Sequence, residues 1–324
     1  MTTRARAESG KNIFTTQPSF KTSYASFDVS TPPNHKPGHI EWPTGKPDPA
    51  KSFVVRHQDV FDREEFYSAV KHAAGSGKSI GFFVHGYNTN FPEALYRLTQ
   101  MSVDSNIDGV PILFAWPSQG TVSGYVADKE AVTYSRDDLA SALIRVSKIN
   151  RNKDTLVFAH SMGSWLLMES LRQLKLSGHD DILARLKIVL AAPDIDANVF
   201  RTQLTTIGKL PKPITILVAK DDRALKVSSL LTAESRRLGA LDVSDPEVVA
   251  TARLANVQIV DISNVESEDS FKHSRYASMV SVLPQLEKGR QGNSTIGRAG
   301  AYVFSAAGDT IASPFKLVGQ VIGQ

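Results

Sequence analysis

The sequence predicts an α/β fold in which a mostly parallel sheet carries helices on both faces. Nearly continuous runs of Val, Ile, Leu, Phe and other apolar residues occur within 80–84, 154–158 and 186–191, and segments with a helical spacing of apolar residues alternate with such runs. Apolar runs of this kind are typical of strands buried on both faces, and their alternation with helices is typical of parallel sheets. The 324 residues are enough for one large domain with appended segments.

Composition excludes several classes of protein. The hydrophobic share of 41% and the charged share of 22% are ordinary for a soluble globular protein. The formal charge is only +4, and its lysines and arginines are scattered, so no nucleic-acid partner is expected. The chain has no cysteine and no H-E-x-x-H spacing, so we expect neither disulfide nor metal and no cofactor.

The sequence also bears on location. No apolar run approaches the roughly 18 residues that a membrane span needs. The first residues lead into polar sequence without the apolar core of a secretory signal. We therefore expect a cytoplasmic protein, with leaderless export as the alternative.

The chain divides into three parts. Residues 1–50 are rich in Ser, Thr, Pro and Lys without any period, which predicts an extended or disordered arm. The main domain spans 51–289, and its first ordered element is a short strand at 53–55. A Gly-, Ala- and Ser-rich extension follows at 290–324, with helical spacing of apolar residues from 299 to 311. That helix could pack on its own domain, form an oligomer contact or associate weakly with a membrane surface, and the oligomeric state stays open.

Within the main domain, strands and helices alternate. Asp62 and Glu65 form a capping-box pattern that opens a helix reaching about Ala74. Because the carboxyl ends of parallel strands meet at one edge of the sheet, we expect the chemistry there. The later strands are expected at 80–84, 110–115, 154–158, 186–191, 213–219 and 256–262, and the helices near 91–103, 128–149, 162–176, 226–238 and 274–286.

Ser161 is the candidate nucleophile. It follows the strand at 154–158, opens a helix, and stands between small residues two positions away on each side, which is typical of a nucleophile elbow. The usual pattern has glycine at both small positions. Gly163 matches it, and Ala159 is the smallest possible departure. The alternative is a serine that only caps its helix.

A candidate acid and base follow in the expected order. Asp222, in the turn after the strand at 213–219, is the preferred acid, although it could simply start a helix. Asp221 and then Asp194 are the alternative acids. His273 is the candidate base because no other histidine follows these acids along the chain.

An oxyanion hole needs two backbone N–H groups. Met162, directly after the nucleophile, supplies one, and Tyr87, in the loop after the strand at 80–84, is the expected second donor. Gly86 allows a close approach of that loop to the substrate. Asn88 could add a side-chain donor or stabilise the loop. His85 and His160 are interpreted as structural.

A substrate pocket is expected beside these groups. The loop 116–127 is positioned to cover it, and we expect Gly86 and Asn88 on one side of it. Trp116, Tyr125 and Met162 would line an apolar acyl site. Core packing is an equal alternative for Trp116.

These residues resemble the alpha/beta-hydrolase superfamily over about 80–286. More narrowly, they are similar to a bacterial branch catalogued as an alpha/beta hydrolase of unknown function. The resemblance implies a mostly parallel sheet of about eight strands and the activity of an esterase, lipase or related acyl hydrolase. It rests on His85-Gly86-Tyr87-Asn88, Phe114-Ala115-Trp116-Pro117-Ser118, Ala192-Pro193-Asp194-Ile195-Asp196 and Asp221-Asp222-Arg223-Ala224-Leu225.

The functional expectation is a serine hydrolase that cleaves a carboxylic ester through a Ser-His-Asp triad and an acyl-enzyme. Its substrate would be a small-molecule or lipid ester. An acyltransferase or a peptidase with the same triad is one alternative. A non-catalytic binding protein on a hydrolase fold is another, because a fold alone does not guarantee function.

Overall fold

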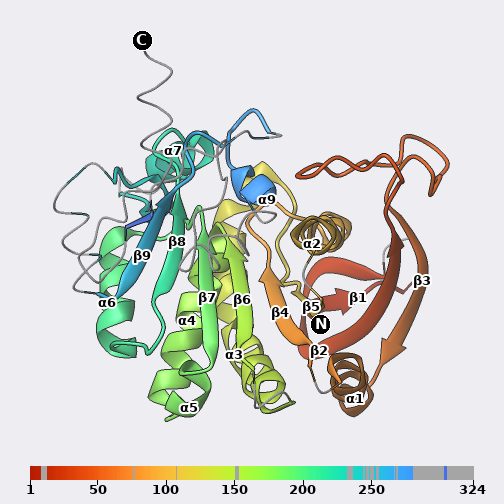
Figure 1. Ribbon diagram of the computed structural model, residues 1–324, viewed down its shortest axis with the longest axis horizontal. Helices are drawn as coiled ribbons and strands as arrows, with labels where there is room; N and C mark the ends of the chain where they lie inside the picture. Colours follow the sequence, from red (N-terminus) through yellow and green to blue (C-terminus); the bar gives the residue numbers. More distant parts are fainter. Residues whose placement is uncertain are drawn as a thin grey trace.

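The α/β fold class is confirmed, because the computed structural model contains one central sheet that is parallel except at one edge (Figure 1). The strand order is β10-β9-β8-β7-β6-β4-β5, with β10 antiparallel to β9. About eight strands were expected, and the described part of the chain supplies seven. They are β4 (Ser79–Val84), β5 (Gly109–Phe114), β6 (Thr155–His160), β7 (Leu186–Ala191), β8 (Ile214–Val218), β9 (Val257–Asp261) and β10 (Val303–Phe304).

The structure describes most of the chain. The described residues are 1–8, 13–75, 77–106, 108–149, 153–231, 236–243, 245, 248, 252, 255–265, 267, 269–279 and 303–304.

Helices cover both faces of the sheet and bury two apolar clusters against it. On one face lie α1 (Arg63–Ala74), α3 (Tyr125–Ile149), α4 (Met162–Leu176) and α6 (Ala197–Ile207), and on the other lie α2 (Phe91–Ser105) and α9 (Arg275–Met279). The remaining helical segments are η1 (Val122–Gly124), α5 (Asp180–Leu183), α7 (Arg223–Leu231) and η2 (Leu238–Ala240).

The starts of the helices show which of them could be predicted from nearby residues in the sequence. Helix α1 begins after Asp62 with the predicted capping box, in which Asp62 and Glu65 each accept from the other's backbone N–H. Helix α6 was not predicted, although the side chain of Asp196 caps it by accepting from Asn198 and Val199. Of the helix expected at 274–286, the structure describes α9, and 280–286 lies outside the described residues.

The N-terminal region differs from the expected arm. Strands β1 (Thr2–Arg6), β2 (Phe14–Ser30) and β3 (Val54–Phe61) form an antiparallel sheet, so regular structure begins well before residue 53. Figure 1 shows this sheet beside the β5 end of the central sheet, and Thr2 bridges to Ala115 just after β5. The register of β2 is set by pairing with β3, tens of residues away, which the local apolar pattern does not reveal.

The C-terminal extension is described only at Val303–Phe304, which pair with β9 as β10 instead of continuing the expected helix. The other positions of that helix lie outside the described residues. No helix in the described part of the chain is long and apolar enough to cross a bilayer.

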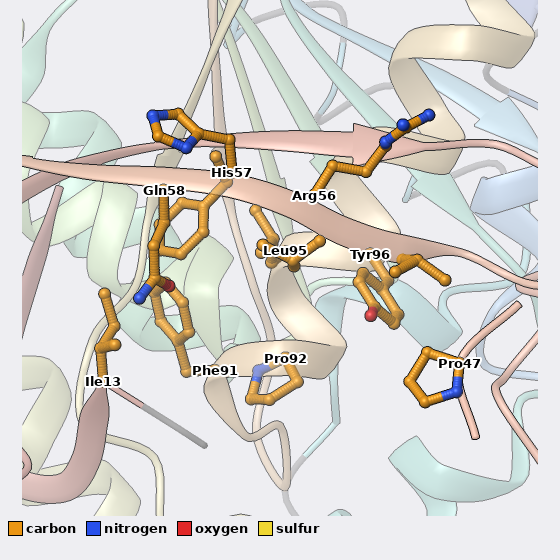
Figure 2. Close-up of a pocket in the computed structure, with 12 residues that line it drawn as sticks. Ile13, Pro47, Arg56, His57, Gln58, Phe91, Pro92, Leu95 and Tyr96 are labelled. Carbon is orange, nitrogen blue, oxygen red and sulfur yellow. The ribbon is translucent and has the colours of Figure 1, made fainter. Parts of the chain in front are cut away.

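An open pocket of about 560 Å³ separates β3 from the first turns of α2. Figure 2 shows the α2 side chains of Phe91, Pro92, Leu95 and Tyr96 on one side of it and the strand carrying Arg56, His57 and Gln58 on the other. None of its lining residues is a candidate for the expected chemistry. This pocket is therefore a feature of the contact between the N-terminal sheet and α2.

Candidate active site

Ser161 occupies a strained turn between β6 and α4. Its backbone has φ 52° and ψ −123°, a positive-φ conformation that costs a non-glycine residue about 1–3 kcal/mol. Three backbone hydrogen bonds hold the turn. The Ser161 N–H donates to the Ala191 carbonyl at 2.9 Å, and its carbonyl accepts from Ser164 at 3.0 Å and Asp194 at 3.2 Å. The elbow predicted from the sequence is therefore formed and braced by the end of β7.

The small residues beside Ser161 have steric reasons. A methyl group at Gly163 would lie 2.2 Å from the carbonyl oxygen of His85 and 2.7 Å from that of Val84, both of them backbone atoms. Ala159 is fully buried and packs in the main apolar cluster. The turn therefore requires glycine on the helix side and accommodates a methyl group on the strand side.

The loop after β4 lies against this elbow. A methyl group at Gly86 would come within 2.9 Å of the Ser161 Cβ and 2.8 Å of the His160 Nδ1. Tyr87 follows, and its hydroxyl donates to the carbonyl of Val122, so its side chain is turned toward η1. Only the backbone N–H of Tyr87 remains as its candidate contribution to an oxyanion hole.

Asn88 is exposed and stabilises the loop through its backbone. It has φ 52°, and its N–H donates to Asp128 at 3.4 Å. Met162 is the first residue of α4, so its N–H is among the four amides that have no acceptor within the helix. An anion beside Ser161 would meet this amide and the positive end of the helix dipole.

His273 and Asp222 are brought together at the same edge of the sheet. Nδ1 of His273 lies 2.6 Å from Oδ2 of Asp222, and since a carboxylate only accepts, Nδ1 carries the proton. Asp222 is fully buried, and its other oxygen accepts from the Leu225 N–H at 3.0 Å. Burial lowers the pKa of His273, but the charge of Asp222 and its hydrogen bond outweigh burial, so the pKa lies above its usual value.

Asp221 has a different partner. Arg275 donates to both of its oxygens, at 2.5 and 2.8 Å, and Lys272 donates to one at 2.8 Å. These contacts, that of Arg275 above all, hold the pKa of Asp221 well below its usual range. Asp221 therefore ties the loop carrying His273 to the turn after β8 but does not contact the imidazole.

The side chain of Asp194 belongs to a buried polar network next to the Ser161 turn. Tyr125 donates to its carboxylate at 3.1 Å and Ser228 at 2.5 Å, while Nε of Arg237 lies 3.2 Å away. Burial, with a further contribution from Asp194, raises the pKa of Tyr125 to about 12. Asp194 thus supports Ser161 from its backbone, while its carboxylate joins β7, α3 and α7.

Trp116 is packed in the core beside the loop after β4. It is fully buried, its indole N–H donates to the carbonyl of His85 at 2.7 Å, and its ring stacks on the His85 imidazole with centroids 5.0 Å apart. Burial, with a smaller effect of Arg4, lowers the pKa of His85 to about 3, so His85 is neutral. The core alternative for Trp116 and the structural interpretation of His85 both fit this arrangement.

His160 is packed between aromatic rings. Its centroid lies 4.1 Å from that of Tyr276 and 4.6 Å from that of His273. Burial above all, with the nearby His273, lowers the pKa of His160 well below its usual value. His160 is therefore a neutral neighbour of the candidate base.

Asp269 was not predicted. Its carboxylate accepts from the backbone N–H groups of His273, at 3.1 Å, and Ser274, at 2.6 Å, and also from the hydroxyl of Ser274. Burial would raise the pKa of Asp269, but these hydrogen bonds and one from Ser267 hold it well below its usual range. In the sequence, Asp269 is recognisable only as an acidic residue four positions before His273.

Arg4 and Asp128 form a second support that the sequence did not reveal. Arg4 is buried and donates to the carbonyls of Thr89 at 2.8 Å and Ser118 at 3.1 Å. Burial lowers its pKa to about 10, even though the charge of Asp128 raises it. Asp128 accepts from Ser118 at 2.6 Å and from the Gln119 N–H at 2.7 Å. The N-terminal sheet thus helps to hold the loop that carries Tyr87.

In the described part of the chain, no group of three or more His, Cys, Asp or Glu side chains is placed to hold a metal ion, so these residues offer no set of metal ligands.

The comparisons agree with this architecture. A family model described as "Alpha/beta hydrolase of unknown function (DUF900)" matches residues 62–290, which include β4 to β9 and every candidate residue of the site. No curated protein matches the chain. The match spans well over half of the chain, and the protein belongs to this family of alpha/beta hydrolases.

Proposed function

We propose that this protein is a serine hydrolase that cleaves a carboxylic ester with Ser161, His273 and Asp222. The observation that supports this most strongly is the 2.6 Å contact between His273 and the fully buried Asp222. Because Asp222 occupies Nδ1, Nε2 is the nitrogen of His273 left to take a proton from Ser161.

The reaction would follow from these positions. His273 takes the proton of the Ser161 hydroxyl as Oγ attacks the ester carbonyl, and the negative oxygen of the tetrahedral intermediate accepts from the N–H groups of Met162 and Tyr87. The alcohol leaves with the proton from His273, which gives an acyl-enzyme. Water then attacks the acyl group, passes its proton to His273, and releases the acid as Ser161 regains its proton. The sequence of steps needs no cofactor.

The electrostatics favour this role for His273. Asp222 stabilises the imidazolium that forms in each proton transfer, and the raised pKa of His273 reflects that stabilisation. Base catalysis needs the neutral imidazole, so activity should be lost as the pH falls through this pKa.

Covalent labelling with a fluorophosphonate probe tests the proposal. The wild-type protein should label and should hydrolyse members of a panel of short- and long-chain esters, and Ser161→Ala should do neither. Ser164→Ala is the matched control, because it removes a hydroxyl of the same helix that bonds the Ala159 carbonyl. Failure of the folded wild-type protein to label, or labelling that survives Ser161→Ala, would contradict the proposal. Matched amides and acyl acceptors in the same panel would detect a peptidase or an acyltransferase.

A further inference from the structure

Several large apolar side chains are exposed around the candidate site. Scattered exposed apolar residues are normal, but a cluster on one face marks an interaction surface. The cluster, called the apolar rim below, consists of Val122 (72% exposed), Val126 (72%), Val227 (45%), Leu230 (69%), Leu231 (61%) and Phe271 (54%).

Hydrogen bonds tie the segments of the apolar rim together. The hydroxyl of Tyr125, next to Val126, lies 2.9 Å from that of Ser228, next to Val227. This contact places the start of α3 against α7. The carbonyl of Phe271 accepts from the Arg223 N–H at 3.0 Å, so the other end of α7 meets the loop of His273.

The apolar rim also borders the catalytic groups. The carbonyl of Val122 accepts from the hydroxyl of Tyr87, which places η1 beside the candidate oxyanion loop. Phe271 lies two residues before His273, and α7 begins directly after Asp222. The exposed apolar surface therefore belongs to the face on which Ser161 would meet its substrate.

The opposite end of the sheet provides a comparison. Figure 1 shows α7 and α9 at one end of the sheet and α5 at the other. Near the α5 end, α4 ends in the exposed Leu176. Leu176 is the one large apolar side chain exposed on α4, whereas α7 carries three.

Among the described residues of α7 and of the turn before it, the exposed charges are positive. Lys220, Arg223 and Lys226 are exposed in or just before α7. The two carboxylates of that turn are paired, Asp221 with Arg275 and Asp222 with His273. Exposed apolar residues flanked by basic residues are the combination that binds anionic lipid surfaces.

A lipid surface fits this face better than a protein partner does. A tightly bound protein would cover the approach to Ser161, whereas a fluid bilayer would present ester molecules to it. We propose that the apolar rim docks on an anionic lipid surface and presents the active site to lipid esters there, which rests on the proposed ester hydrolysis.

Vesicle sedimentation of the full chain tests this docking. The Ser161→Ala variant should sediment with vesicles of phosphatidylcholine containing about one third phosphatidylglycerol, and less with phosphatidylcholine alone or at high salt. Adding Leu230→Ser and Leu231→Ser should lower the partition coefficient about tenfold. Val122→Ser with Val126→Ser tests the same surface from another element. The matched control, Leu176→Ser at the α5 end, should bind as the parent does.

The outcomes separate the two proposals. Absence of vesicle binding, or equal losses in the rim and control variants, overturns the docking. A dimer that dissociates in the Leu230→Ser and Leu231→Ser variant and does not bind vesicles also overturns it, because a second copy then covers the rim. Binding in the Ser161→Ala background does not depend on hydrolysis, so the proposed chemistry is judged separately, by fluorophosphonate labelling of the wild type and its loss in Ser161→Ala.

Discussion

The turn that carries Ser161 and the loop that carries His273 lie at the same edge of the sheet but are held by different forces. The Ser161 turn depends on backbone contacts, with hydrogen bonds to Ala191 and Asp194, and on the absence of a side chain at Gly163. The loop of His273 depends on carboxylates. Asp222 holds the ring and Asp269 holds the backbone N–H groups.

Asp221 adds a third carboxylate through its contacts with Arg275 and Lys272. Backbone sterics do not change with pH, whereas carboxylates lose their hold when they are protonated. The conformation of the Ser161 turn should therefore be sensitive to side-chain volume and insensitive to pH. The position of His273 should be sensitive to the charge of the carboxylates around it.

The largest effect is expected from Asp222→Asn. Loss of the carboxylate removes both the orientation of His273 and the stabilisation of its imidazolium, which in a Ser-His-Asp triad costs about 10⁴-fold in kcat. Burial would then be the dominant influence on the pKa of His273, so the acid limb of the residual kcat/KM profile should move to lower pH. The measurement is kcat/KM on a soluble ester as a function of pH.

Asp221→Asn is the control for that prediction, because it changes the neighbouring carboxylate and leaves the Asp222 contact in place. It should cost activity about tenfold at most, through a less firmly held loop. A larger loss in Asp221→Asn than in Asp222→Asn would show that the acid has been assigned to the wrong residue.

The next effect concerns the turn of Ser161. Gly163→Ala puts a methyl group 2.2 Å from a backbone oxygen, so β4 or the turn must move. Overpacking of this kind costs about 1–3 kcal/mol or more, and a displacement near 1 Å at the site can cost about 100-fold in rate. Urea unfolding and the rate of fluorophosphonate labelling measure the two effects.

Ala159→Gly is the matched control on the strand side of the same turn. It restores the usual glycine and should cost at most about 1 kcal/mol, because glycine is less favourable in a strand. Labelling by Gly163→Ala at the wild-type rate, or greater damage from Ala159→Gly, would contradict the steric account of the turn.

The difference between the two regions also explains what could be predicted from sequence. The turn is encoded by adjacent residues, since its sterics involve Ala159, Ser161 and Gly163 together with one neighbouring strand. The alternation of strands and helices, and with it the fold class, could be read for the same reason. The choice between Asp221 and Asp222 could only be ranked, because two adjacent residues in a turn point in different directions.

The remaining supports depend on contacts between distant residues. Arg4 reaches Thr89, 85 positions away, and Thr22 donates to Asp138, 116 positions away. The local sequence pattern does not reveal such long-range pairings. For this reason residues 1–50 were expected to form an extended or disordered arm, not a sheet. Trp116 was ambiguous for a related reason, because its burial is set by stacking on His85 from another strand end.

The smallest effect is expected from Asp269→Asn, which tests whether the loop of His273 is held by charge. The amide keeps the size of the side chain but places an NH₂ group toward N–H donors, so one or more hydrogen bonds of the loop must break. Lost hydrogen bonds to a charged group cost about 1.5–3 kcal/mol when buried, and Asp269 is partly exposed, so about 1 kcal/mol and a tenfold loss of activity are expected.

The pH dependence of stability distinguishes a charge effect from a packing effect at Asp269. Its pKa in the folded protein lies below the usual value near 3.9, so the carboxylate stabilises the fold above that pH, and this stabilisation is lost as the pH falls below about 4. The variant should therefore lose less of its free energy of unfolding than the wild type between about pH 5 and pH 3. Asp59→Asn, on the exposed strand β3, controls for the removal of one charge. Parallel pH profiles for wild type and Asp269→Asn would mean that the loop is held by packing, and the contrast between the two regions would then fail.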